Sequence, residues 1–99
     1  MKNRIEYHLY LGRNEGDRPI DTARLKVFFS VTGPWLAQGY TLINALGCWE
    51  GEVEDSIILV YIGKDTDRGI VRKVGAAYKA WFNQQAVLMT EQPVVLEMI

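Results

Sequence analysis

Residues 40–62, YTLINALGCWEGEVEDSIILVYI, contain two apolar segments joined by the short polar sequence Glu50-Gly51-Glu52. So short a link predicts a β-hairpin with strands over Tyr40–Trp49 and Val53–Ile62. The second strand ends in an unbroken apolar run from Ile57 to Ile62. A strand of this kind needs cover on both of its faces. The hairpin therefore predicts a sheet that is packed on two sides.

The segments that precede the hairpin predict one strand and one helix. Residues Arg4–Leu11 alternate between apolar and polar side chains, which is the period of a strand. A polar, glycine-rich loop over Gly12–Pro19 follows it. Asp21 or Thr22 then caps a helix whose apolar stripe is Leu25, Phe28 and Phe29, and Gly33-Pro34 ends that helix.

The segments that follow the hairpin predict a second helix and two further strands. Gly63–Asp67 caps a helix whose apolar residues, from Ile70 to Phe82, recur at helical spacing. Ala86–Thr90 is expected to form a fourth strand. Gln92-Pro93 is expected to break it, because proline cannot donate a backbone hydrogen bond. Val94–Ile99 is then expected to form a short last strand.

The order of these elements predicts the fold class. It is α+β, a ferredoxin-like β-α-β-β-α-β two-layer sandwich with a short C-terminal strand extension, and residues 1–99 form a single domain. Both helices should cover one face of the sheet. The apolar residues on the other face predict that a second copy covers it or a strand edge, in a homo-oligomer such as a dimer or trimer.

The composition excludes several classes of protein. An apolar fraction of 48% and a net charge of −1 are not those of a disordered chain or of a dedicated nucleic-acid binder. The single cysteine, Cys48, allows no internal disulfide and is expected to be buried. No apolar run is long enough for a membrane span or a signal peptide, so a cytoplasmic location is expected. No cofactor or metal is expected, because the chain has one histidine and no ligand cluster.

Two stretches resemble a family of small uncharacterised bacterial and phage domains. They are Gly47–Glu52 with the following Glu54-Asp55-Ser56, and Ala77–Leu88, which runs into the fourth strand. This resemblance implies the fold and no assigned activity. The predicted architecture is also similar to PII-like and CutA-like proteins, and that likeness implies trimers that bind small ligands between subunits.

Three groups of residues are candidates for a binding site. His8 and Tyr10 lie with Glu6 on the polar side of the first strand, where they could hold a polar ligand or transfer protons. Trp49 stands beside Glu50 and Glu52 at the hairpin turn, and an aromatic residue at a turn can anchor a ligand. Arg13 and Arg18 lie in the loop before the first helix, where they could bind an anion.

These candidates support three hypotheses for function. The first is an oligomeric binding or regulatory protein that is not an enzyme. It would hold a small anion or nucleotide in a subunit cleft formed by Trp49, the acidic turn and the Arg13–Arg18 loop. The second is a cofactor-free enzyme of the dimeric α+β barrel type that uses His8 and Tyr10. The third is an inhibitor or accessory protein that binds another protein through an exposed strand edge.

Overall fold

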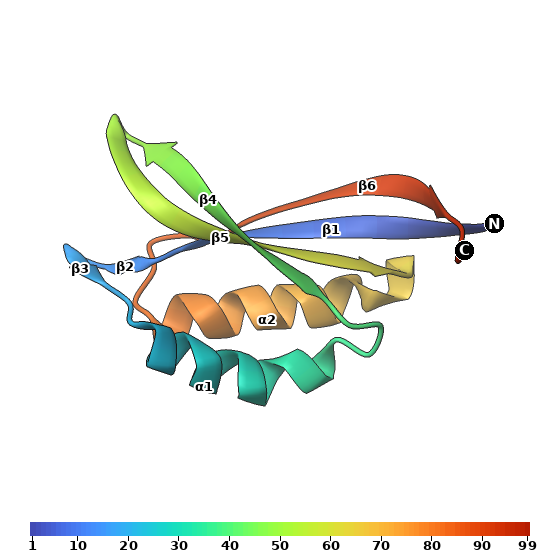
Figure 1. Ribbon diagram of the computed structural model, residues 1–99, viewed down its shortest axis with the longest axis horizontal. Helices are drawn as coiled ribbons and strands as arrows, with labels where there is room; N and C mark the ends of the chain where they lie inside the picture. The colour runs from blue at the N-terminus through green and yellow to red at the C-terminus, as the bar shows by residue number, and fades with distance from the viewer.

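The computed structural model describes residues 1–99 and consists of one four-stranded antiparallel sheet with two helices against one face (Figure 1). The main elements are β1 (Lys2–Gly12), α1 (Thr22–Thr32), β4 (Thr41–Trp49), β5 (Glu52–Gly63), α2 (Arg68–Trp81) and β6 (Leu88–Leu96). The strands lie in the order β4-β5-β1-β6. This is the predicted ferredoxin-like sandwich.

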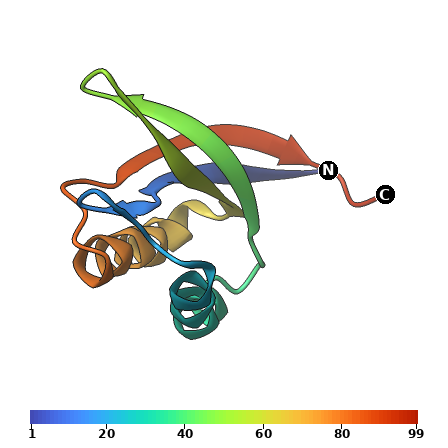
Figure 2. The ribbon, with the colours of Figure 1, turned by 60° about the vertical axis from the view of Figure 1, so that its left-hand side comes forward.

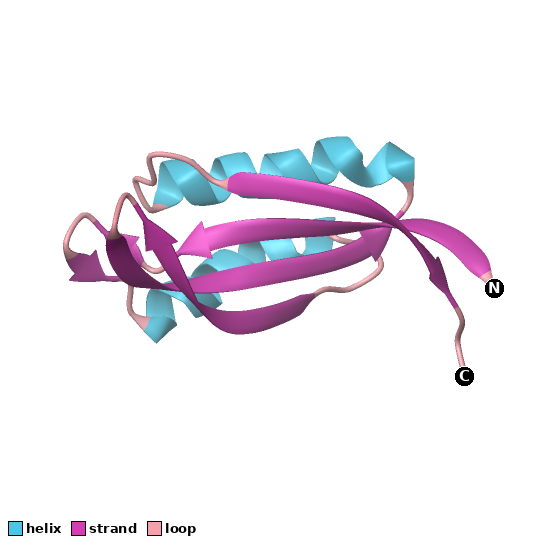
Figure 3. Cartoon of the chain, turned by 90° about the horizontal axis from the view of Figure 1, so that it is seen from above, coloured by secondary structure: helices cyan, strands magenta, loops and turns pink.

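The first strand, β1, lies inside the sheet and pairs with β5 on one side and β6 on the other, as Figure 3 shows from above. Successive side chains of β1 point alternately to the helix-covered face and to the opposite face of the sheet. Tyr7, Leu9 and Leu11 are buried against the helices, whereas His8 and Tyr10 point to the opposite face and are only half-buried. The register carries this division into β5, where Leu9 lies opposite Leu59 and is likewise buried.

Aromatic rings fill the space between the two helices and the sheet. Phe28 of α1 is fully buried, and its ring lies 5.2 Å from that of Tyr78 and 5.5 Å from that of Phe82. The predicted apolar stripes of both helices are therefore the core. Close contact between α2 and the sheet depends on Gly75, where a Cβ atom would lie 3.3 Å from Leu9 Cδ2.

The β4–β5 hairpin turns at Glu50-Gly51, as the sequence predicts. Both residues have positive φ, 50° and 79°, which is the geometry of a type I′ turn. The end of the hairpin bends away from the helices (Figure 2). Cys48 lies in this projecting part and is exposed, so the expectation that it is buried is wrong. The strands curve away from both helices at this end, which leaves Cys48 uncovered (Figure 2).

Two boundaries differ from the sequence predictions. The Gly12–Pro19 loop contains a small hairpin, β2 (Asn14–Glu15) with β3 (Arg18–Pro19). The expected break at Pro93 does not occur, because β6 continues from Leu88 to Leu96 and no separate C-terminal strand exists. β6 is an edge strand of the sheet, and an edge is where a strand tolerates proline, since no further strand needs its N–H.

Three buried tyrosines fix loops to the core through their hydroxyl groups. Tyr7 donates to the carbonyl of Lys64 at 2.7 Å, Tyr61 donates to the Asp67 carboxylate at 3.1 Å, and Tyr78 donates to the carbonyl of Gly12 at 2.6 Å. Burial raises the pKa of each of the three phenols. Each must stay protonated in the folded protein to keep its hydrogen bond.

Replacing Tyr78 by phenylalanine should lower the free energy of unfolding by about 1 kcal/mol at pH 7, because the Gly12 carbonyl loses its donor. The raised pKa of Tyr78 gives stability that is complete below the unfolded-state pKa near 10 and is lost as the pH rises above it. The wild type should therefore lose about 1 kcal/mol relative to Tyr78→Phe between pH 9 and pH 11. Urea titrations at both pH values measure this difference, and a constant difference would contradict it.

Candidate functional site

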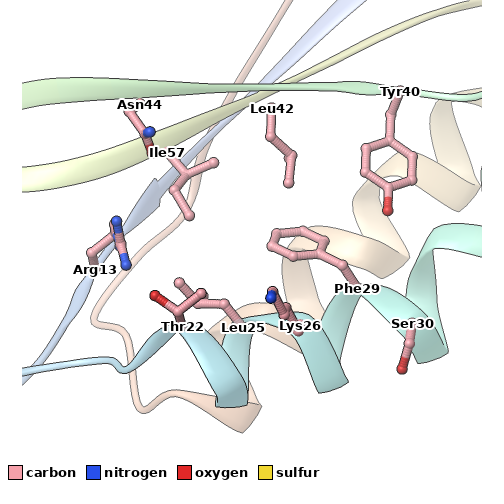
Figure 4. Close-up of a pocket in the computed structure, with 10 residues that line it drawn as sticks. All are labelled: Arg13, Thr22, Leu25, Lys26, Phe29, Ser30, Tyr40, Leu42, Asn44 and Ile57. Atoms are coloured by element: carbon pink, nitrogen blue, oxygen red, sulfur yellow. The ribbon is translucent and has the colours of Figure 1, made fainter.

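A cleft of about 500 Å³ separates α1 from β4. We call it the α1–β4 cleft. Figure 4 shows Arg13 at one end, Tyr40 at the other, and Phe29 facing Leu42 between them. Its volume lies in the range of small-molecule sites. The lining residues come from four parts of the chain and are Arg13, Thr22, Leu25, Lys26, Phe29, Ser30, Tyr40, Leu42, Asn44 and Ile57.

The loop that carries Arg13 is held by backbone and side-chain bonds. The N–H of Arg13 donates to the carbonyl of Asp55 at 3.0 Å, and the Arg13 carbonyl accepts from Ile20 N–H at 2.7 Å. Farther along the same loop, the carboxylate of Glu15 accepts hydrogen bonds from both terminal nitrogens of Arg24, at 2.6 and 3.2 Å. This contact with Arg24 holds the pKa of Glu15 below its usual value. The backbone of Arg13 is therefore fixed, while its guanidinium faces the cleft (Figure 4).

The apolar floor of the cleft comes from α1 and the strands. Leu25, Phe29 and Ile57 are buried, and Leu42 is 40% exposed above them. The rings of Phe29 and Tyr40 lie 6.1 Å apart at 31°, which makes an aromatic wall at one end. Tyr40 reaches this position because Gly33 leaves space for it. A Cβ atom at Gly33 would lie 2.7 Å from the Tyr40 hydroxyl oxygen.

The charge of the cleft differs from that of the whole protein. Its lining holds two cations, Arg13 and Lys26, and no carboxylate, although the chain has 12 acidic and 11 basic side chains. Neither cation forms a salt bridge, since the salt bridges of the structure involve His8, Arg24 and Arg68. The cleft therefore offers two free positive charges beside an apolar floor.

Several polar groups around these cations also lack partners within the chain. The side chains of Thr22, Tyr40 and Asn44 form no intramolecular hydrogen bond, in contrast to Ser30, whose hydroxyl donates to the Val27 carbonyl at 2.7 Å. A site that binds a ligand needs a few polar groups with free hydrogen-bonding capacity among apolar contacts. The α1–β4 cleft has this composition.

The structure places the predicted site residues in separate regions. Arg13 lines the cleft, whereas Arg18 is exposed on β3. Trp49, Glu50 and Glu52 lie at the projecting tip of the hairpin, and Trp49 is 60% exposed. None of these three forms a side-chain hydrogen bond or a salt bridge. The Arg13–Arg18 loop meets the hairpin farther from its tip, where the Asn14 side chain donates to the Glu54 carboxylate at 3.4 Å and Arg13 N–H donates to the Asp55 carbonyl.

His8 and Tyr10 lie on the sheet face that the helices leave open. Nε2 of His8 lies 3.0 Å from Oε2 of Glu6, and Nδ1 lies 3.5 Å from the Tyr10 hydroxyl. The side-chain amide of Gln92 donates to the same Glu6 oxygen at 2.9 Å. The predicted row exists as a hydrogen-bonded chain, but it does not line the α1–β4 cleft.

The sequence interpretation missed most of the cleft. Lys26, Tyr40 and Asn44 come from α1, the segment before β4, and β4 itself, and no motif links them. In the sequence, Lys26 directly follows Leu25, a residue of the apolar stripe of α1. This is a weak sign that a lysine lies at the border of the core. Many surface lysines share that position, so the pattern alone does not identify a site.

Comparisons with known proteins place the chain in a family. The family described as "Protein of unknown function (DUF3574)" matches residues 6–98. The chain belongs to this family. The resemblance to an uncharacterised family is therefore confirmed. No curated protein matches the sequence. In addition, no helix of this family member is long and apolar enough to cross a membrane.

Solved structures confirm the fold. A phage SAM lyase in its apo state has a TM-score of 0.73 and 19% identity, over 92% of this chain and 81% of that one. The PII-like nitrogen regulatory protein CPII of Thiomonas intermedia K12, bound to ADP, AMP and bicarbonate, has a TM-score of 0.59 and 11% identity, over 99% and 98%. A putative PII-like signalling protein from Thermus thermophilus has a TM-score of 0.50 and 14% identity, over 93% of this chain and 86% of that one. At these identities the likeness concerns the fold.

Replacing Glu15 by glutamine should loosen the loop that positions Arg13, because the contact with Arg24 loses its charge. Amide hydrogen exchange at Arg13 and Ile20 should then become about two- to fivefold faster, as expected for a partly exposed ion pair. Glu52→Gln, in the exposed hairpin, is the control and should leave both amides unchanged. Equal exchange rates in the two variants would show that the ion pair does not hold this loop.

Proposed function

We propose that the protein binds a small anionic ligand of the adenosine nucleotide class in the α1–β4 cleft. The observation that supports this most directly is the pair of cations, Arg13 and Lys26, in a cleft without a carboxylate. In such a place a phosphate group is attracted by both charges. The neighbouring low-dielectric surface strengthens that attraction relative to open solvent. The protein would act as a binding or regulatory protein.

The rest of the cleft suits the apolar part of such a ligand. Phe29 and Leu42 face each other across its middle, and Tyr40 stands at the end away from Arg13 (Figure 4). A planar base would pack on Phe29, while the free side chains of Thr22 and Asn44 would bind sugar or phosphate oxygens. Arg13 stands at one end, Lys26 lies near the middle below Phe29, and Tyr40 stands at the other end (Figure 4). A nucleotide would place its phosphate toward Arg13 and its base on Phe29.

The compared structures favour the same class of ligand. CPII was solved with ADP and AMP, and the name of the phage enzyme refers to S-adenosylmethionine. These three molecules are all adenosine derivatives with an anionic group beyond the ribose. S-adenosylmethionine also carries a positive sulfonium, which Arg13 and Lys26 would repel. We therefore expect AMP and ADP to bind this chain more tightly than S-adenosylmethionine.

Isothermal titration calorimetry with AMP tests the proposal. Arg13→Ala and Lys26→Ala should each weaken AMP binding about tenfold, because each removes one charge-assisted contact with the phosphate. Arg18→Ala is the matched control. It removes a cation from the same loop without touching the cleft, and its affinity should stay within about twofold of the wild type. Adenosine, which lacks the phosphate, should bind at least about tenfold more weakly than AMP.

Three results would contradict the proposal. The first is the absence of measurable heat with AMP or ADP at millimolar concentration. The second is equal loss of affinity in Arg18→Ala and Arg13→Ala, which would place the ligand outside the cleft. The third is tighter binding of S-adenosylmethionine than of AMP, because the two unpaired cations would then not determine the preference.

A further inference from the structure

The side of the sheet opposite the helices is not covered by any part of the chain (Figure 1). We call it the open sheet face. The strand register shows which residues share it, since residues that lie directly opposite one another in an antiparallel pair point to the same side. Its central residues are Glu6, His8 and Tyr10 of β1, Ile58, Val60 and Ile62 of β5, Thr41 and Ile43 of β4, and Leu88, Thr90, Gln92 and Val94 of β6.

The apolar part of this face lies mainly on β4 and β5. Ile58 and Val60 lie between Ile43 of β4 and the polar row of β1, and Leu88 of β6 lies across that row, opposite Tyr10. Ile43 is 47% exposed and Leu88 is 61% exposed. The apolar residues Ile43, Ile58, Val60 and Ile62 share this face on the adjacent strands β4 and β5, which is unusual for a surface that stays in water.

The polar row of β1 is joined by hydrogen bonds within the chain. Glu6 accepts hydrogen bonds from both His8 and Gln92, at 3.0 and 2.9 Å. When His8 Nε2 donates to Glu6, its Nδ1 can accept from the Tyr10 hydroxyl at 3.5 Å. Removing water from an unsatisfied polar group is costly, whereas a satisfied network avoids that cost. The row already pairs Glu6 Oε2, both ring nitrogens of His8 and the Tyr10 hydroxyl within the chain, which lowers the cost of covering these groups with a partner.

We propose that the open sheet face of one copy packs against the open sheet face of another copy of this chain. Charge supports a second copy as the partner. Glu6, His8 and Tyr10 are the titratable side chains at the centre of the face, and Arg4, at the start of β1, balances Glu6. Two such faces meet without net repulsion. A strongly charged partner would find no complementary patch there.

The size of the face fits this partner. Four strands, each nine residues or longer, cover roughly 30 by 19 Å, or about 570 Å² in flat projection, from the usual strand rise and spacing. Stable protein interfaces bury about 800 Å² of accessible surface per partner, and side-chain relief makes accessible surface larger than its projection. The face is thus large enough for a specific contact between two copies.

Multi-angle light scattering after gel filtration, at about 100 μM protein, tests the proposal. The wild type should elute with a mass of at least twice the 11.3 kDa of one chain. Val60→Lys places a charge opposite His8 at the centre of the face and should give 11.3 kDa. Val31→Lys is the matched control, because Val31 is exposed on α1, away from the sheet, and it should keep the wild-type mass.

Two outcomes would overturn the proposal. One is a monomeric wild type, and the other is association that persists in a folded Val60→Lys protein, since the contact would then lie at a strand edge or on the helices. If Val60→Lys does not fold by circular dichroism, Ile43→Lys takes its place, because Ile43 is already 47% exposed. AMP titration of the same variants separates this proposal from the ligand proposal. The α1–β4 cleft lies between the helix layer and the sheet, so a monomeric Val60→Lys should keep wild-type affinity.

Discussion

The central position of β1 is the constraint on which the rest of the structure depends. β1 pairs with both β5 and β6, so its alternation determines which side of the whole sheet is apolar and which carries polar groups. A shift of one residue would turn Tyr7, Leu9 and Leu11 to the open side and place His8 and Tyr10 against the helices. The polar groups buried in this way would then lack partners. The register is therefore fixed by burial.

The candidate cleft follows from that register. Arg13 comes directly after the last residue of β1, so the direction in which it points is determined where β1 ends and the β2–β3 hairpin begins. α1 then starts at Thr22 and packs Phe28 into the core, which leaves Lys26 on the side of the helix that faces β4. Two cations from different elements thus reach one cleft because both elements are anchored to the same core. Neither cation contributes to that core.

The sequence predicted those features that depend on neighbouring residues. The β-hairpin, the apolar stripes of both helices and the order of elements follow from period and turn chemistry, and all appear in the structure. The prediction of a strand break at Pro93 was wrong because it ignored that an edge strand needs no outward hydrogen bond. The cleft was not predictable in the same way. Lys26, Tyr40 and Asn44 meet only through the distance between α1 and β4, which packing sets. The exposure of Cys48 likewise depends on how the end of the hairpin curves away from the helices (Figure 2).

The position of the ligand on the folded chain tests most directly whether the two cations of the α1–β4 cleft form the binding site. ¹H–¹⁵N correlation spectra recorded during addition of AMP report on each backbone amide separately. If the two cations hold the ligand, the largest shifts should occur at Arg13, Lys26 and Leu42, around the α1–β4 cleft, with little change at the hairpin tip. Shifts centred on Trp49 and Glu52, or on His8 and Tyr10, would contradict this prediction, because the ligand would then occupy one of the regions that the fold keeps apart from the two cations.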